Sequence, residues 1–416
     1  MANTLKFGNG QWATKVGSTL AYNDENGNFK PLPFDFTRAS SATRVNKQGL
    51  IETVGSNEPR VDYLDNADGH LLLEPSRTNI VPRSEDLDTG WSKLNVTIAN
   101  NETTSPDGNI SAGLVTVTST SGSHANYDTF ATSTTPSVSH YISCFVKKST
   151  TRYIRLVEGY SSATLNFDLD NGEIVSLSGG SSNSILQDFG NGWYRIGFQF
   201  TSNVTGDLQF ALYLNNNSNS ASYAGAGEAV YLWGAQIELG YLTSYIRTSG
   251  SAVTRVAEDA MNLTLPSSDI IGTTTSTFYL NFKALANDLT NRWISFEEVG
   301  VATDNEFEIR LGAVSNLMQV VSRSAAGGQD IVMSNTLSDI TSDNKIAVKY
   351  NGLNWSFFVN GVSVDTEVAA RLFNDSIQKI RFARYNNTNP FYGIVKEMKI
   401  YNTALTDAEL QALTTL

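Results

Sequence analysis

The sequence predicts an all-β protein in which an irregular N-terminal region is followed by two antiparallel β-sandwich domains. Many short runs alternate apolar and polar residues with period two, as half-buried strands do. Ser, Thr, Asn and Gly are abundant, with 32 Gly against 9 Pro, which favours tight turns between strands. At roughly 100–200 residues per domain, 416 residues correspond to two or three domains. A 40% hydrophobic and only 17% charged composition fits a folded chain.

Residues 1–82 form the irregular region. Asn26-Gly27 lies between two apolar runs and predicts a hairpin turn, and Pro31 and Pro33 indicate an edge or extended segment. The remainder has little periodicity, so we expect it to pack against something else and to serve in attachment or oligomerisation. Five arginines lie between short apolar triplets and are expected to meet carboxylates such as Glu52, Glu58 and Glu74 across an interface: Arg38, Arg44, Arg60, Arg77 and Arg83.

Residues 83–247 contain about eight strand signals at the spacing of a two-sheet jelly roll. Within 140–149, Ile142, Cys144 and Val146 share one face of a predicted strand. The run 162–178 predicts a hairpin that turns at Asp170-Asn171-Gly172.

Residues 248–416 predict a second sandwich with its own core. Asn351-Gly352 and Asn360-Gly361 mark two consecutive hairpins. The chain ends in the one predicted helix, where Thr406 is the N-cap and Glu409, three residues later, completes a capping box.

Charge and composition exclude several classes of protein. The net charge of −12, without a basic run, argues against a nucleic-acid partner, because phosphate neutralisation needs clustered Lys and Arg. No stretch approaches 18 apolar residues, so we expect no membrane insertion. The single cysteine, Cys144, excludes an internal disulfide and a zinc site with several thiolates. Nothing in the sequence indicates a cofactor.

Glycoside hydrolysis is the most specific catalytic hypothesis, because it needs two carboxylates on one face. Glu306, Glu308 and Arg310 share a strand face, but an arginine stands where a third acid is wanted. We therefore interpret this row as a solvated ion-pair face. The adjacent Glu297 and Glu298 point to opposite faces, and a solvated or loop role is favoured for them.

Nucleophilic catalysis is also disfavoured. Cys144 and His140 are four residues apart on one predicted strand, a separation of about 13 Å at roughly 3.3 Å per residue. A lone cysteine at this position is typical of a small buried hydrophobe. We therefore expect no catalytic residues and no enzymatic activity.

Three acidic turns could be considered for calcium, but none matches the twelve-residue loop with a closing Glu. Asp and Asn bonding to their own backbone explains all three turns, and we predict no metal site. The three turns are 65–69, 86–88 and 168–170.

Aromatic side chains provide the remaining site chemistry. Exposed rings can stack on sugars, although core packing is the alternative for each tryptophan in a strand. Trp91 and Tyr160 lie near predicted turns, where exposure is easier. The candidate glycan contacts are Trp91, Tyr160, Trp193 and Trp233.

Two stretches resemble a segment of tailed-bacteriophage virion proteins, namely FTRASSATRVNKQGLIETVGSNEPRVDY with LLLEPSRTNIVPRSEDL, and VYLWGAQIELGYLTSYIRTSGSAVTRVAED. The likeness to head fibres, head spikes and tail fibres covers most of residues 33–260, including a carbohydrate-binding-like jelly roll. NWSFFVNGVSVD and FYGIVKEMKIYNTALTDAELQAL are similar to concanavalin/laminin-G-like sandwiches.

This resemblance implies a structural subunit of a virion appendage, with 1–82 as its attachment and oligomerisation region. The expected partners are the chain itself, as a homotrimer, other virion proteins and host-surface glycans. The expected location is the virion surface. A tail fibre or receptor-binding protein, a carbohydrate-binding module and a polysaccharide-active enzyme remain alternatives.

Overall fold

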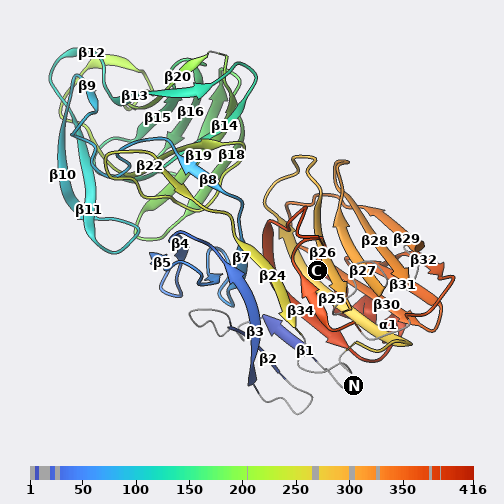
Figure 1. The fold of residues 1–416 in the computed structure, drawn as a ribbon. Coiled ribbons are helices and arrows are strands. Elements are labelled where there is room, and N and C mark those ends of the chain that lie inside the picture. The colour runs from blue at the N-terminus through green and yellow to red at the C-terminus, as the bar shows by residue number, and fades with distance from the viewer. Residues whose placement is uncertain are drawn as a thin grey trace. The chain divides into compact units, whose positions relative to one another are not determined.

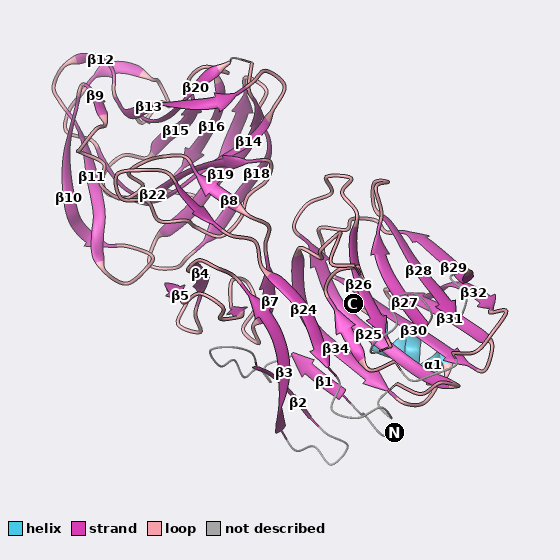
Figure 2. Cartoon of the chain, viewed as in Figure 1, coloured by secondary structure: helices cyan, strands magenta, loops and turns pink. Residues whose placement is uncertain are grey.

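The computed structural model describes residues 5–8, 19–23, 29–203, 205–264, 271–298, 305–324, 328–373, 377–384 and 386–416. The chain divides into two compact units, and it passes between them four times. One unit contains 1–41, 54–75 and 256–416, and is called the C-terminal sandwich below. The other contains 42–53 and 76–255, and is called the jelly-roll unit. Figure 2 shows that strands dominate both units.

The jelly-roll unit consists of two packed antiparallel sheets, as predicted (Figure 1). In the described residues its first sheet has the order β10 (Val96–Thr104), β11 (Ile110–Val117), β22 (Ala229–Leu239), β14 (Ser139–Lys148), β19 (Trp193–Thr201) and β18 (Ser182–Asp188). Its second sheet has the order β17 (Glu173–Ser178), β16 (Ala163–Asp168), β15 (Tyr153–Glu158), β20 (Gly206–Asn215), β13 (Ala125–Thr134) and β9 (Ser92–Leu94).

The core of this unit lies between the two sheets, where alternate side chains of each strand meet. Ile142, Cys144 and Val146 point into it together, as their alternation predicted. Cys144 is completely buried, and burial raises the pKa of its thiol. It is therefore a small core residue, as expected.

In the described residues, the jelly-roll unit also has three shorter strand pairs. They are β4 (Ala42–Val45) with β5 (Ile51–Val54), β8 (Arg77–Asn79) with β23 (Val253–Arg255), and β12 (Ser121–Ser123) with β21 (Ser222–Ala224). The β8–β23 pair joins the two stretches that begin and end this unit. Asn79 reinforces this closure, because its side-chain amide donates to the carbonyl oxygens of Ala235 and Ile246.

The C-terminal sandwich also has two antiparallel sheets. In the described residues, the first sheet has the order β32 (Val362–Val368), β31 (Asn354–Val359), β30 (Asn344–Asn351), β25 (Thr275–Ala284), β34 (Gly393–Tyr401), β7 (His70–Leu73) and β6 (Arg60–Asp62), with β1 (Leu5–Gly8) also on β34. The second has the order β2 (Thr19–Asn23), β3 (Phe29–Thr37), β24 (Asp259–Thr264), β33 (Lys379–Arg381), β26 (Arg292–Glu297), β27 (Asn305–Leu311), β28 (Leu317–Ser324) and β29 (Gln329–Thr336).

The predicted local signals are confirmed where the structure describes them. The turn at 170–172 joins β16 to β17, and the two Asn-Gly turns join β30 to β31 and β31 to β32. Asn360 and Gly361 both have positive φ, which asparagine and glycine tolerate best. The helix α1 (Asp407–Thr414) begins after the Thr406 N-cap with the predicted capping box. Asn26-Gly27 lies outside the described residues.

The N-terminal region does not form a unit of its own. Residues 54–75 supply β6 and β7 to the C-terminal sandwich, whereas 42–53 belong to the jelly-roll unit. The side chains of Leu71 and Leu73 lie in the core of the C-terminal sandwich. The irregular region lacks a core of its own because its apolar residues complete the cores of other elements.

A buried charge network fixes this region to the C-terminal sandwich. Glu258 accepts from Arg38 Nη1 at 2.7 Å and from Arg60 Nη2 at 2.6 Å, and Arg60 Nη2 also binds Glu74 at 2.7 Å. The arginine side chains and Glu258 are completely buried. Burial alone lowers the pKa of Arg60, but attraction to Glu258 and Glu74 raises it overall.

The expected pairing of these arginines with carboxylates therefore occurs within one chain. Arg60 meets Glu74, and Arg44 Nη2 lies 2.6 Å from Glu52 in a half-exposed pair. Arg38 binds the backbone oxygen of Glu58 rather than its side chain. These contacts need no second subunit, so they do not support the interface for which they were expected.

In the described part of the chain, no helix is long and apolar enough to cross a membrane.

Candidate functional site

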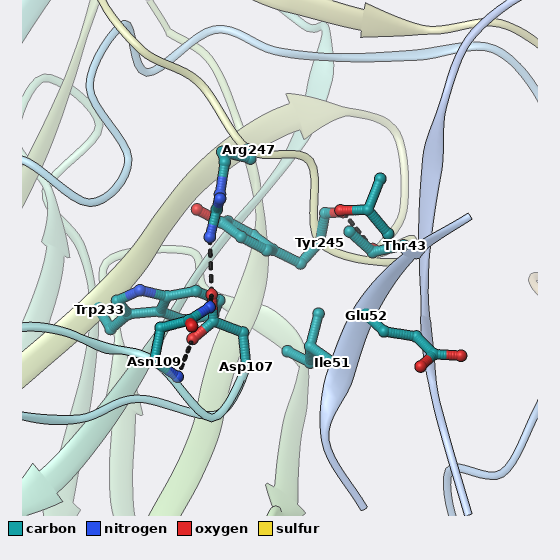
Figure 3. Close-up of a pocket in the computed structure, with 9 residues that line it drawn as sticks. Thr43, Ile51, Glu52, Asp107, Asn109, Trp233, Tyr245 and Arg247 are labelled. Carbon is teal, nitrogen blue, oxygen red and sulfur yellow. Dashed lines mark hydrogen bonds and ion pairs between the residues drawn. The ribbon is translucent and has the colours of Figure 1, made fainter. Parts of the chain in front are cut away.

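A polar cavity of about 240 Å³ opens in the jelly-roll unit (Figure 3). Its wall combines two aromatic rings with carboxylate, amide, hydroxyl and guanidinium groups. The lining residues are Thr43, Ile51, Glu52, Thr53, Asp107, Asn109, Trp233, Tyr245 and Arg247. We call it the Trp233 cavity.

The aromatic floor lies on the outer face of the first sheet, away from the core. Trp233 and Tyr245 contact each other with ring centroids 4.6 Å apart, and Trp233 also meets Phe145 edge-on. A register shift between β14 and β22 lies beside Trp233. Gly234 has a φ of +64°, and a Cβ there would lie 2.7 Å from the Phe145 ring. Glycine at this bulge therefore allows the aromatic rings to pack closely.

The polar wall is organised around Asp107, in the turn between β10 and β11. Its carboxylate accepts from Ser105 Oγ, from the backbone and side chain of Asn109, and from Arg247 Nη2 at 2.7 Å (Figure 3). Arg247 Nε donates to Glu85 at 2.7 Å. The guanidinium thus bridges two acids and keeps a half-exposed position.

The two acids bound to Arg247 differ in their protonation equilibria. Burial raises the pKa of Glu85 above its usual range, despite Arg247 and the hydroxyl of Tyr245. Burial also acts to raise the pKa of Asp107, but hydrogen bonds from Ser105 and Asn109 and the charge of Arg247 lower it overall. Both acids accept strong charge-assisted bonds, which hold the wall in one geometry.

The β4–β5 hairpin forms the opposite wall of the cavity. The Thr43 hydroxyl donates to the Tyr245 carbonyl, and the Ile51 amide donates to the Pro106 carbonyl at 2.9 Å. Asn46 closes the hairpin turn by accepting from the amides of Gln48 and Leu50. The hairpin therefore belongs to the jelly-roll unit through direct backbone bonding.

A second cavity of about 490 Å³ also has Arg247 in its wall. Ligand sites of proteins span about 300–1,000 Å³, so this volume can hold a small sugar. Nearly all of its lining groups are polar. They are Arg83, Glu85, Asp86, Thr89, Asn100, Asn101, Ser111, Arg247, Thr248 and Ser249.

The four aromatic residues proposed for glycan contact have different environments in the structure. Trp91 and Trp193 are buried, and their indole nitrogens donate to the carbonyls of Arg83 and Thr104. Trp233 is also buried, but it lines the cavity and donates to Ser111. Tyr160 is the one ring of the four with substantial exposure, at 41%. The exposure expected for Trp91 fails because its ring packs edge-on against Phe210 in the core.

Sequence reasoning did not select Arg247, Tyr245, Asp107 or Asn109. Arg247 and Tyr245 belong to the phrase YLTSYIRTSGSAVTR, so the motif contained them without indicating a role. Asp107 lies 140 residues from Arg247 in the chain. No local sequence pattern predicts that two residues so far apart form an ion pair.

The acidic row in the C-terminal sandwich is ion-paired, as predicted, but it is not solvated. Glu306 and Glu308 are 2% and 0% exposed. Arg323 Nη1 binds Glu306 at 2.6 Å and Glu308 at 2.8 Å, and Arg310 also binds Glu308. These arginines lie over the acids and remove them from water. Their long stems make the burial possible.

Glu297 is likewise buried rather than solvated. Its carboxylate pairs with Arg381 Nε at 3.0 Å and accepts from the Ser295 hydroxyl. Glu297 also stands opposite Glu306 in the β26–β27 pairing. The solvated or loop role expected for Glu297 is therefore wrong, because Arg381 and Ser295 bind its carboxylate within the sheet.

We predict a measurable pH dependence from this cluster. Burial, then the charge of Glu308, raise the pKa of Glu306 from 4.5 to about 7. A raised carboxyl pKa favours the folded state at low pH, so this stabilisation is full below about pH 4.5 and is lost as the pH rises towards 7. At 1.36 kcal/mol per pKa unit, the effect is at most about 3 kcal/mol.

Guanidinium unfolding of the wild type and Glu306→Gln at about pH 5 and about pH 8 checks this prediction. The variant is expected to lose less stability than the wild type across that interval. Equal losses in the two proteins would contradict the assignment.

The acidic turns follow the expected turn chemistry. Asn66 Oδ1 accepts from the Asp68 amide, Asp86 from the amides of Asp88 and Thr89, and Asp168 from those of Asp170 and Asn171. Within the described ranges, no group of three or more His, Cys, Asp or Glu side chains is placed to hold a metal ion.

One part of the chain matches a known protein family. Residues 258–411 match the family model for the concanavalin A-like lectin/glucanases superfamily, of laminin-G type. This match confirms the concanavalin/laminin-G-like sandwich predicted for the C-terminal segment. No curated protein matches the chain.

Several solved structures align with part of the chain. The CBM40 of the Ruminococcus gnavus IT-sialidase, bound to α2,3-sialyllactose, is 17% identical with a TM-score of 0.30 over 34% of this chain and 84% of that one. The heptameric SAP-like pentraxin of Limulus polyphemus is 9% identical with a TM-score of 0.28 over 33% and 68%. This chain is thus an all-β protein whose residues 258–411 are similar to concanavalin A-like lectins and glucanases.

Proposed function

We propose that the chain is a structural subunit of a bacteriophage virion appendage, a head fibre or spike, and that its jelly-roll unit contacts host-surface glycans. The observation that supports the glycan contact is the pair of polar cavities that both have Arg247 in their walls. Sugars are recognised by planar polar side chains near aromatic carbon. The Trp233 cavity has both in its lining, and the second cavity adds polar groups. The lectin-type sandwich of residues 258–411 supports the same general class of function.

The arrangement favours binding over hydrolysis. Glycosidases need one carboxyl that donates a proton and another that is free to attack or to activate water. Asp107 and Glu85 instead both bind Arg247, and Asp107 also accepts from Ser105 and Asn109. We therefore propose a non-catalytic role, and polysaccharide cleavage is the competing outcome.

The appendage role is supported by the sequence resemblance of residues 33–82 and 231–255. In the structure, these stretches contribute buried contacts such as Arg38 with Glu258 and Asn79 with Ile246. A segment with such buried contacts is suited to holding the domains of an appendage in a stable structure. A tail fibre or receptor-binding protein has the same requirement and remains the alternative position on the virion.

We also propose that the assembled subunit is a homotrimer that binds other virion proteins. Light scattering on the full chain gives the number of subunits directly. A monomer would contradict the trimer for the free protein.

A glycan array tests the proposed glycan contact. The full chain is expected to bind a subset of bacterial surface glycans, and Asn109→Ala is expected to weaken that binding roughly tenfold, as for a lost hydrogen bond of about 1.4 kcal/mol. Asn109 is exposed, so we expect its replacement to preserve the fold. Lys93→Gln, which removes an exposed charge outside both cavities, is the matched control. Unchanged binding by Asn109→Ala would contradict a site in the Trp233 cavity.

A further inference from the structure

A row of tyrosines crosses the outer face of the second sheet of the jelly-roll unit. Arg155 on β15 pairs with Tyr213 on β20, and Tyr153 lies two residues before Arg155 on the same face. Tyr127 on β13 pairs with Ala211, two residues before Tyr213. Tyr213 is therefore the diagonal neighbour of Tyr153 on one adjacent strand and of Tyr127 on the other, a separation that aromatic side chains can span.

These rings are directed away from the core. The neighbouring residues Ile154 and Leu214 are completely buried in the core, whereas all three tyrosines are partly exposed. In the described part of the molecule, their hydroxyl groups form no hydrogen bond. The row therefore presents aromatic surface with polar edges to solvent.

Arg155 has an unusual environment within this row. Its guanidinium stacks on the Tyr213 ring, with 4.7 Å from Cζ to the ring centroid. Its Nε is buried and without an acceptor. Among the described residues, the guanidinium forms neither an ion pair nor a hydrogen bond. A fixed cation without a counter-ion is a strong candidate for binding an anion.

Arg152 shows the contrasting case on the same sheet. It stacks on Tyr153 with a distance of 4.7 Å, but it also binds Asp168 at 2.7 Å. Asp168 accepts further bonds from the Asp170 and Asn171 amides. Asp168, which stands opposite Tyr153, is therefore already engaged, and the residue that pairs with Arg155 on β16 is the neutral Asn166.

We propose that the Tyr153–Tyr213–Tyr127 row and Arg155 form a second glycan site that selects sugars bearing a carboxylate. The guanidinium offers two parallel N–H donors, which match the two oxygens of a carboxylate. Stacking on Tyr213 holds its plane, and the adjacent rings pack against the apolar faces of the flanking sugars. Asn166 supplies a neutral amide beside the guanidinium.

This site is distinct from the Trp233 cavity, which lies on the first sheet. The inference shares only its ligand class, glycans, with the proposed function. The chain has a net charge of −12, so its overall electrostatic field repels an acidic polymer. Binding of such a polymer therefore requires a local cation, and Arg155 supplies it.

A matched pair of probes tests the carboxylate directly. Calorimetry on the full chain uses hyaluronan hexasaccharide, which carries glucuronate, and the same hexasaccharide after reduction of its carboxyl groups. We expect the uronate form to bind at least tenfold more tightly. Equal affinities, or no binding of the uronate form, would overturn the proposal, as would a preference for a sulfated oligosaccharide over the uronate.

Variants of Arg155 test whether the uronate binds at this residue. Arg155→Gln is expected to reduce uronate binding at least tenfold, and Arg155→Lys is expected to bind with intermediate affinity because a single ammonium lacks the guanidinium fork. Lys396→Gln, which removes an ion-paired cation from the C-terminal sandwich, is the control and should bind as the wild type does. Wild-type affinity in Arg155→Gln would contradict the assignment.

The same titration separates the two sites. If Asn109→Ala abolishes uronate binding while Arg155→Gln retains it, the sugar lies in the Trp233 cavity, and the proposed function stands without this second site. The reverse pattern supports the tyrosine row independently of the cavity.

Discussion

Replacing Glu258 with glutamine is expected to destabilise the C-terminal sandwich by about 3–5 kcal/mol, the range found when one partner of a buried ion pair is removed. Its carboxylate binds both Arg38 and Arg60, whose side chains are completely buried. The neutral amide removes the negative charge that both arginines bind, and Arg60 keeps Glu74 as a partner. Denaturant unfolding of the full chain measures the effect.

The pair Arg44–Glu52 provides the matched control, because its side chains are 24% and 37% exposed. Glu52→Gln is expected to cost less than about 1 kcal/mol, as is usual for an exposed ion pair. Equal effects of Glu258→Gln and Glu52→Gln would show that the buried network does not stabilise the fold.

A fragment of residues 253–416 is expected to melt without a cooperative transition. The sequence predicts a sandwich with its own core over residues 248–416, but β3, β6 and β7 of this sandwich come from earlier in the chain. The fragment lacks Leu71 and Leu73 from its core, leaves β34 without its β7 partner, and deprives Glu258 of both arginines. Thermal melting and dye binding to exposed apolar surface compare the fragment with the full chain.

A cooperative transition of the fragment near that of the full chain would contradict this prediction. It would show that residues 258–411, which match the lectin-type family, contain all that their fold requires.

Local structure was predictable because its causes are local. The Asn-Gly turns at 351–352 and 360–361, the Thr406 capping box and the alternation around Cys144 each depend on neighbours within a few residues. Period-two alternation also gave the all-β class and the two sandwiches, because one face of each strand must be buried.

Long-range pairing was not predictable from the sequence alone. Arg60 meets Glu258 across 198 residues, and no local pattern identifies the acid that a given arginine binds. Burial of Glu306 and Glu308 was missed for the same reason, since alternation shows that they share a face but not what covers it. The Trp233 cavity brings together the β4–β5 hairpin, the β10–β11 turn, β22 and the segment that follows β22. Of its lining residues, only Trp233 was a candidate glycan contact from the sequence.

The most direct test of the account is a crystal structure of the full chain with an oligosaccharide selected by the glycan array. We predict an intact sugar in the pair of cavities that Arg247 borders, hydrogen-bonded to Asn109 and to the Asp107–Arg247 pair. A cleaved sugar, or an intact one held only by the C-terminal sandwich, would contradict a non-catalytic glycan site in the jelly-roll unit.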